Sequence, residues 1–165
     1  MSMINIGGAR AASTLTAIKA GDVQPNAVDL RLGKIMKMND GTFTIDEERK
    51  IHRGSVSLEV HSDGYYYLEN GSYEVVMENE INVGPNEAGF VITRSTLNRN
   101  GCFLTSGLYD TGYEGVMAGV LHVNGGLMRI KPGTRVGQYL CFDAESLSSY
   151  DGDYGTGKDH DTKYT

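Results

Sequence analysis

Two neighbouring runs of the chain hold residue types that can handle a phosphorylated substrate. Arg94, Ser95 and Thr96 place a cation beside two hydroxyls, and side chains of these kinds bind phosphate. Asp110 follows between two tyrosines, inside the glycine-rich run 107–115. A carboxylate held in a turn a few residues beyond a phosphate clamp can take a proton from water that attacks phosphorus. The two runs therefore predict a site that activates water against a phosphorus atom.

The rest of the chain reads as the β scaffold that positions these runs. Short β-prone segments recur about every ten residues, separated by turn pairs such as Asp63–Gly64 and Asn70–Gly71. No segment longer than a few turns has the hydrophobic period of a helix. Residues 13–21 could form a short helix or turn that Gly21 ends. This spacing predicts an all-β sandwich or barrel.

Asp29 lies in a run with the period of a half-buried strand. Val28, Leu30 and Leu32 alternate with polar Asp29 and Arg31, so Asp29 is expected on the face opposite the core. By pattern alone, the simpler interpretation is a solvated strand carboxylate.

The last 22 residues differ from the rest in composition. The chain has 165 residues, enough for one domain with a real core. Residues 144–165 are rich in glycine, hydroxyls and aromatics and poor in aliphatics. We therefore predict a β domain over residues 1–143 and a flexible glycine-rich lid over 144–165, whose N–H groups can wrap phosphate. A disordered polar tail is the alternative.

Charge and composition limit the classes of partner that the protein is expected to bind. The net charge of −6 argues against general binding to nucleic acid or to an anionic membrane surface. The sequence holds no apolar run of membrane-spanning length and no secretory signal pattern. Cys102 and Cys141 are the only cysteines, and we expect them to be buried and reduced. A cytoplasmic protein that binds neither nucleic acid nor membrane is the expectation.

Four runs, in order and similarly spaced, resemble the motifs of a known superfamily. Residues 24–33 resemble the first motif of the deoxycytidine triphosphate (dCTP) deaminases. Residues 94–99, 107–115 and 130–138 resemble the second, third and fourth motifs, which those deaminases share with the trimeric deoxyuridine triphosphatases (dUTPases). The resemblance covers residues 24–142.

The resemblance implies a distorted jelly-roll subunit, a homotrimer whose three active sites combine neighbouring chains, and Mg²⁺ bound with a deoxynucleoside triphosphate. It implies that Asp110 activates the attacking water and that the ring of Tyr113 packs beneath the deoxyribose. It implies that Asp29 lies near the water shell of the metal. The substrate contacts expected from these motifs and from the tail are Arg94, Ser95, Thr96, Arg99, Ser106, Gly107, Tyr113, Gln138, Tyr154, Lys158, Lys163 and Tyr164.

One position separates the two branches. The deaminases that the sequence resembles place a catalytic glutamate ten residues after the motif-three aspartate, and here that position is Val120. Valine cannot shuttle a proton between water and a cytosine ring, so the deaminase branch is disfavoured. The tail resembles both branches, and the hydroxyls of Thr105 and Ser106 are closer to the deaminase pattern, so the choice between uracil and cytosine stays open.

The leading hypothesis is Mg²⁺-dependent hydrolysis of dUTP to dUMP and diphosphate by water attack on the α-phosphorus. A dCTP deaminase-like or dCTP-hydrolysing enzyme is one alternative. The other is a catalytically weak, nucleotide-binding regulatory trimer that binds a protein partner through the hairpins of residues 39–72.

Overall fold

The computed structural model describes residues 2–8 and 10–164, and almost all of its regular structure is β. The strands are β1 (Met3–Ile4), β2 (Thr14–Leu15), β3 (Val28–Met38), β4 (Thr44–Ile45), β5 (Lys50–Ile51), β6 (Ser55–Ser57), β7 (Tyr66–Leu68), β8 (Gly71–Asn82), β9 (Glu87–Thr93), β10 (Phe103–Thr105), β11 (Glu114–Val123), β12 (Met128–Ile130) and β13 (Arg135–Asp143). One short helix, α1 (Ser95–Asn98), and a 3₁₀ helix, η1 (Asp159–Tyr164), complete the described elements. The run 13–21 contains β2 and turns in place of a helix, because Thr14 and Leu15 pair with β8.

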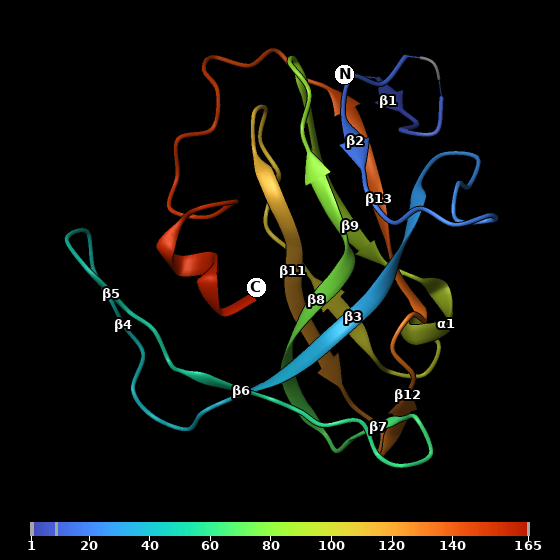
Figure 1. The fold of residues 1–165 in the computed structure, drawn as a ribbon, viewed down its shortest axis with the longest axis vertical. Coiled ribbons are helices and arrows are strands. Elements are labelled where there is room, and N and C mark those ends of the chain that lie inside the picture. Colours follow the sequence, from blue (N-terminus) through green and yellow to red (C-terminus); the bar gives the residue numbers. More distant parts are fainter. Residues whose placement is uncertain (1, 9, 165) are drawn as a thin grey trace.

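The strands form a curled antiparallel sheet in two layers that share β3 (Figure 1). The first half of β3 pairs with β13, which also pairs with β9 and β1. The second half pairs with β8, which continues the sheet to β11 and then to β10. The prediction of an all-β, distorted jelly-roll subunit is confirmed.

The two layers face each other across an apolar core. Strands β3, β8, β11 and β13 each send fully buried side chains into it, among them Leu30, Val75, Leu121 and Tyr139. Both cysteines are buried and free, as expected from the sequence. Within the part of the chain that the structure describes, every helix lacks the length and apolar character of a membrane span.

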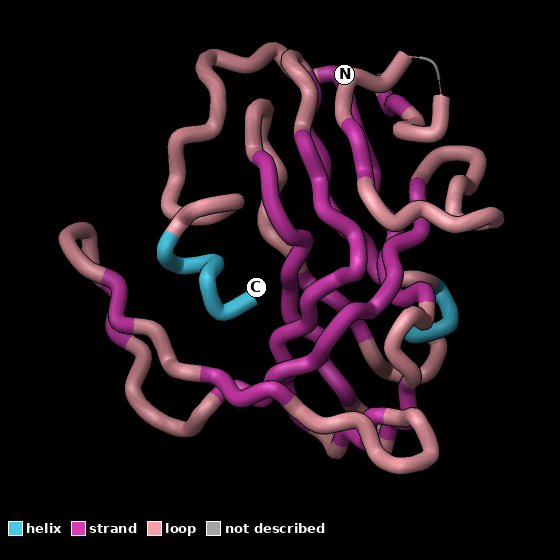
Figure 2. Tube along the Cα trace, in the orientation of Figure 1, coloured by secondary structure: helices cyan, strands magenta, loops and turns pink. Residues whose placement is uncertain are grey.

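Two segments extend beyond the sandwich. The β4–β5 hairpin projects from it, and the tail of residues 144–164 runs back along the same side of the sandwich to η1 (Figures 1 and 2). Lys50 at the hairpin forms an ion pair of 2.5 Å with Asp153 of the tail. The hairpin exposes Phe43, Ile45 and Ile51.

Strand β9 connects the two regions of chemical interest. At its start, Gly89 exchanges backbone hydrogen bonds with Tyr109 (2.7 and 3.0 Å), next to Asp110. At its end the chain passes directly into Arg94 and α1. The length of β9 therefore sets the distance between the two runs singled out in the sequence.

Candidate active site

A buried carboxylate organises the first region. Asp29 in β3 has no exposed surface and accepts hydrogen bonds from the side chains of Gln24 (3.2 Å), Arg135 (3.1 Å) and Gln138 (3.0 Å). The Nε atom of Arg94 lies 3.5 Å from its Oδ1. Arg94 and Arg135 remain 30% and 35% exposed, so their guanidinium groups reach the surface while Asp29 fixes their positions. We call these five residues the Asp29 cluster.

A β-bulge brings two of these donors to the same carboxylate. Arg135 and Gln138 are three residues apart, and in a regular strand such residues point to opposite faces. The register of β13 against β3 shifts between Arg135 and Gly137, so two residues of β13 oppose one of β3 there. After the shift Gln138 lies directly opposite Asp29, and Arg135 reaches it from before the bulge.

A second ion pair lies next to the Asp29 cluster on the same strand. Arg31, two residues after Asp29 on β3, donates two hydrogen bonds to the buried carboxylate of Asp22 (2.9 and 2.6 Å) and one to the carbonyl of Gly133 (2.9 Å). The hydrogen bond from Arg31 lowers the pKa of Asp22, against the opposing effect of burial. Arg31 thus joins Asp22, just before the first motif, to Gly133 in the fourth motif.

The second motif presents the polar groups beside the cluster. Arg94 precedes α1, and Ser95, Thr96 and Arg99 are exposed on or just after this helix. The side chain of Leu97 packs inward and holds the turn against the core. Arg94 and Gln138 therefore meet at Asp29, and Ser95, Thr96 and Arg99 follow Arg94 along the chain without a contact to Asp29.

Asp110 lies on a tight turn that is separate from the Asp29 cluster. The amide of Tyr113 donates to the carbonyl of Asp110 (3.0 Å), and Gly112 follows with a positive φ of 82° that favours glycine. The side chain of Asp110 is exposed, while its neighbours Tyr109 and Thr111 are buried. The bend thus turns one carboxylate outward from an anchored loop.

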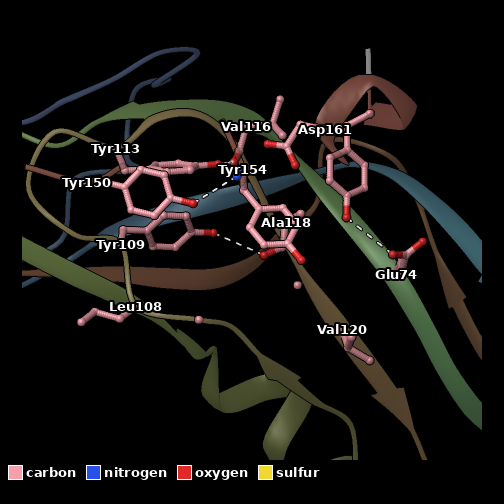
Figure 3. Close-up of a pocket in the computed structure, with 13 residues that line it drawn as sticks. Glu74, Leu108, Tyr109, Tyr113, Val116, Ala118, Val120, Tyr150, Tyr154 and Asp161 are labelled. Atoms are coloured by element: carbon pink, nitrogen blue, oxygen red, sulfur yellow. Dashed lines mark hydrogen bonds between the residues drawn. The ribbon is translucent and has the colours of Figure 1, made fainter. Parts of the chain in front are cut away.

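Beside this bend lies a pocket of about 310 Å³ walled largely by tyrosines (Figure 3). Tyr109 and Tyr113 form its floor, with ring centroids 5.3 Å apart, and their hydroxyls donate to the carbonyls of Ala118 and Val116. Burial raises the pKa of both phenols well above the ordinary value, so both stay protonated and neither serves as a base. Gly107, Val120, Tyr150, Tyr154 and Tyr164 also line the pocket.

The tail packs against the chain it belongs to. The amide of Tyr150 donates to the carbonyl of Thr111 (2.7 Å), and its ring meets Tyr113 edge-on at 5.3 Å. Tyr154 and Tyr164 line the tyrosine pocket, whereas Lys158 lines a separate hollow near Glu80. Lys163 forms an ion pair of 2.6 Å with Glu74. In this arrangement Tyr150, Tyr154 and Tyr164 of the tail line the tyrosine pocket and do not contact the Asp29 cluster.

Ser106 has a structural contact in this arrangement. Its hydroxyl accepts a hydrogen bond from the amide of Val91 (3.0 Å), which ties the loop before Asp110 to β9. Gly107 follows it into the tyrosine pocket.

The Asp29 cluster and Asp110 lie far apart within one chain. Tyr109 pairs with Gly89, and Arg94 stands five residues after Gly89, just past the end of β9, which at the rise of a strand corresponds to roughly 17 Å. A side chain of aspartate cannot span such a gap. The predicted site residues of one chain therefore form two separate half-sites, one with side chains of the kinds that bind phosphate and one with a carboxylate beside an aromatic pocket.

The described residues hold no group of three or more His, Cys, Asp or Glu side chains that could bind a metal ion. Both oxygens of Asp29 already accept hydrogen bonds or contact arginine. This donor set does not form an all-protein cage. It fits Mg²⁺ that keeps its waters and binds mainly to substrate phosphates, with Asp29 as the nearby carboxylate.

A family profile described as dCTP deaminase-like matches residues 8–144, most of the chain. The chain belongs to the dCTP deaminase-like family. Similar relatives include a probable deoxyuridine 5′-triphosphate nucleotidohydrolase of Aeropyrum pernix, 33% identical over 81% of this chain and 85% of its own. Another, from Methanosarcina barkeri, bears the same name and is 35% identical over 80% of each chain.

Two solved structures of low identity share the fold of this dCTP deaminase-like chain. A 2′-deoxycytidine 5′-triphosphate deaminase from Agrobacterium tumefaciens superposes with a TM-score of 0.62 at 18% identity; the match covers 84% of this chain and 47% of that longer one. A variant dUTPase from phage phi11 of S. aureus superposes with a TM-score of 0.54 at 9% identity, over 88% of this chain and 99% of the other.

Sequence reasoning missed several residues of these half-sites. Gln24 and Arg135 lie inside the first and fourth motifs, and their polar side chains three to five residues from Asp29 or Gln138 were the available signal. Tyr150 and Glu74 carry no local signal, because only the folded chain brings them to the pocket. The interpretation of Asp29 as a solvated strand residue is wrong, since β3 is covered on both faces and Asp29 is fully buried.

Proposed function

We propose that this protein hydrolyses dUTP to dUMP and diphosphate. The oxygen of a water molecule forms a bond to the α-phosphorus, and the bond from that phosphorus to the bridging oxygen breaks, so diphosphate leaves. Asp110 takes the proton of the attacking water. The names of the archaeal relatives, all at about one-third identity, support dUTP as the substrate.

One observation supports this function above the others. The Asp29 cluster holds two partly exposed arginines and two glutamines at fixed positions, and Asp110 is turned outward on an anchored bend. Fixed cations and donors stabilise the charge that develops on phosphate oxygens without reorganising during the reaction. Arg94, Ser95, Thr96, Arg99 and Gln138 are the groups that we assign to the triphosphate, and Lys158 and Lys163 of the tail are added when the lid closes.

Mg²⁺ belongs to this proposal as a partner of the triphosphate. When bound, it would offset the negative charge of the phosphates, with Asp29 near its water shell. Asp29 itself aligns Arg94, Arg135 and Gln138, which is the role that its contacts support directly.

The proposal requires a homotrimer, or at least a second copy of the chain. The two half-sites of one chain are roughly 17 Å apart along β9, so Asp110 of one copy must meet the Asp29 cluster of another. The outward face of β9 supports such contact: Phe90 and Ile92 are 37% and 38% exposed, and Phe90 stacks on Phe142. Apolar side chains gathered on a solvent face are typical of an interface.

Within the pocket, Val120 argues against deamination as the main activity. It lines the tyrosine pocket from β11, where a deaminase would need a carboxylate. Gly107 and Tyr113 line the same pocket and are assigned to the base and the deoxyribose. Tyr154 and Tyr164 are assigned to stacking and closure by the tail.

A substrate panel tests the function. The purified protein is incubated with Mg²⁺ and dUTP, dCTP, dTTP or UTP, and the products are resolved by chromatography. We expect dUMP and diphosphate from dUTP alone at an appreciable rate, and orders of magnitude less product from Asp110→Asn, with nucleotide binding retained. Release of dUTP and ammonia from dCTP would support the deaminase alternative. Tight binding without any product would support the regulatory trimer.

A further inference from the structure

The start of the tail is attached to the bend that carries Asp110. The hydroxyl groups of Thr111 and Ser146 lie 2.5 Å apart, and the amide of Tyr150 donates a hydrogen bond to the carbonyl of Thr111 (2.7 Å). We call residues 146–150 the brace. Because Thr111 directly follows Asp110, the brace contacts the chain one residue away from the carboxylate that the proposed reaction uses as its base.

The brace approaches this bend closely at Gly112. A Cβ atom at this position would lie 3.1 Å from the Cβ atom of Ser149, which is a tighter contact than side-chain carbons normally make. Gly112 also has a positive φ of 82°, which glycine adopts without strain. Both the backbone angle and the space beside the brace therefore favour glycine here.

The ring of Tyr150 is part of the support for Tyr113. The β domain supplies two contacts to Tyr113: the ring of Tyr109, with centroids 5.3 Å apart, and the carbonyl of Val116, which accepts a hydrogen bond from the Tyr113 hydroxyl (2.8 Å). The tail supplies a third, because the rings of Tyr150 and Tyr113 meet edge-on with centroids 5.3 Å apart. Aromatic pairs prefer such arrangements, so Tyr150 favours one orientation of Tyr113. The position of Tyr113 therefore depends in part on where the brace lies.

The hydroxyl of Tyr150 makes a separate contact within the tail. It accepts a hydrogen bond from the amide of Tyr154 (3.1 Å), and both residues line the tyrosine pocket (Figure 3). Tyr154 is the residue assigned above to stacking by the tail. One side chain thus contacts the floor of the pocket through its ring and the closing segment through its hydroxyl.

The position of Tyr113 matters to Asp110 as well as to the bound sugar. The amide of Tyr113 donates a hydrogen bond to the carbonyl of Asp110 (3.0 Å), so a shift of Tyr113 also shifts the bend. In an enzyme, a misplacement of about 1 Å can reduce the rate roughly hundredfold. A side chain that fixes Tyr113 can therefore affect the rate without touching the substrate.

We propose that Tyr150 is a positioning residue of this half-site: its ring fixes Tyr113 and the bend at Asp110, and its hydroxyl fixes Tyr154. This inference rests on the proposed function, because it takes Asp110 as the base and Tyr113 as the ring beneath the deoxyribose. Docking of the tail then completes the geometry for attack on the phosphorus, in addition to covering the substrate.

Steady-state kinetics with dUTP and Mg²⁺ separate the two contacts of Tyr150. Tyr150→Phe removes the hydroxyl and keeps the ring. Tyr150→Leu removes both, and Tyr150→Met does the same with a longer, more adaptable side chain, so it serves if the leucine variant folds poorly. Tyr67→Leu is the matched control. Tyr67 is also partly buried, packs against the ring of His61 and donates a hydrogen bond to Asp63, but it lies on β7, outside the tyrosine pocket.

We expect Tyr150→Phe to raise the KM for dUTP several-fold and to leave kcat within about twofold, because only the amide of Tyr154 loses its acceptor. Tyr150→Leu and Tyr150→Met should also lower kcat by about tenfold or more, because Tyr113 and the bend lose their support. Tyr67→Leu should change neither constant. Urea titrations establish that each variant is folded under the assay conditions.

Three kinetic results would overturn the inference. If both Tyr150→Leu and Tyr150→Met keep kcat within about twofold of the wild type, the ring does not position the site. If Tyr150→Phe loses as much kcat as Tyr150→Leu, the ring has no role of its own. If Tyr67→Leu lowers kcat to the same extent, the loss reflects general destabilisation of the fold.

Hydrogen–deuterium exchange separates this inference from the proposed function, because it needs no turnover. Exchange of residues 107–115 is followed by mass spectrometry, without ligand and with the non-hydrolysable α,β-imido analogue of dUTP. Tyr150→Leu should speed exchange in this segment several-fold, because the amide of Tyr113 is held less firmly to Asp110, whereas Tyr150→Phe should not. If the wild-type protein does not hydrolyse dUTP, the reaction assignment fails and the exchange still decides whether the ring holds the bend. Equal exchange in the wild type and Tyr150→Leu would overturn the inference even in an active enzyme.

Discussion

At the scale of single residues, the chemistry rests on charges that are fixed before any substrate arrives. Asp29 is fully buried, yet the side chains it orients, Arg94 and Arg135, remain partly exposed. Preorganised cations of this kind stabilise developing charge better than flexible ones, because they need no rearrangement in the transition state. Under the proposed function, the buried carboxylate therefore contributes to both the stability of the fold and the binding of substrate.

Replacing Asp29 with asparagine should reduce both the stability of the fold and the affinity for dUTP. The side-chain NH₂ of asparagine would face an N–H donor of Arg135 or Gln138. Two donors cannot pair, so at least one buried hydrogen bond is lost. We expect the free energy of unfolding to fall by about 1–3 kcal/mol in urea titrations. We expect the KM for dUTP to rise at least about tenfold.

Asp46→Asn is the control, since Asp46 pairs with Arg49 at the surface, and the urea midpoint of this variant should equal that of the wild type. An Asp29→Asn protein with wild-type stability and KM would contradict this role.

The Asp22–Arg31 pair should make the stability of the fold depend on pH in a defined direction. The hydrogen bond that Asp22 accepts from Arg31 holds the pKa of Asp22 below its ordinary value in the folded protein. The pair therefore contributes stability above the unfolded pKa of about 4, and this contribution is lost as the pH falls through the lower folded pKa. Unfolding midpoints measured from pH 7 down to pH 2 should show an acid limb, and Asp22→Asn should flatten part of it. An unchanged acid limb in the variant would contradict the assignment.

At the scale of elements, short irregularities place the site residues. The bulge in β13 between Arg135 and Gly137 changes the phase of the strand, so that Arg135 and Gln138 meet one carboxylate. The bend at Asp110 depends on Gly112 in the left-handed region. Such features explain why a regular strand pattern would have misplaced these side chains.

The tail is the element whose attachment we expect to respond to ligand. Its ion pairs, Lys50–Asp153 and Lys163–Glu74, have exposed lysines, and surface pairs of this kind hold a segment weakly. Limited trypsin digestion should cut after Lys158 and Lys163 before it cuts at Lys34, which is paired within β3 and β8. The imido analogue of dUTP should slow cleavage in the tail several-fold. Tail cleavage that is as slow as at Lys34, or unaffected by the analogue, would contradict the predicted lid.

The sequence predicted the parts of the fold and site that depend on local patterns. Alternating residues and glycine turns indicated the β sandwich, and the polar residues at 29, 94 and 138 fell inside recognisable motifs. It could not predict the burial of Asp29, because the strand pattern of one segment does not reveal the second layer that covers it. It could not place Glu74 beside Val120 either, because that contact depends on the register of β8 against β11.

At the scale of the whole molecule, the site is divided. One chain holds an Asp29 cluster without a nearby Asp110, and an Asp110 without nearby phosphate-binding groups. In the proposed trimer this separation would be resolved, because each interface of a closed symmetric oligomer brings the same two half-sites together. We expect light scattering to give a mass three times that of one chain, and an active monomer would contradict the shared site.

Mixing two inactive variants tests the shared site most directly. Asp110→Asn lacks the carboxylate, and Arg94→Ala lacks a fixed cation, so each variant alone should hydrolyse dUTP orders of magnitude more slowly than the wild type. When equal amounts are unfolded and refolded together, about one site in four should combine an intact Asp110 from one chain with an intact Arg94 from its neighbour. The account predicts recovery of roughly a quarter of wild-type turnover in the mixture. A mixture no more active than its two parents would contradict it.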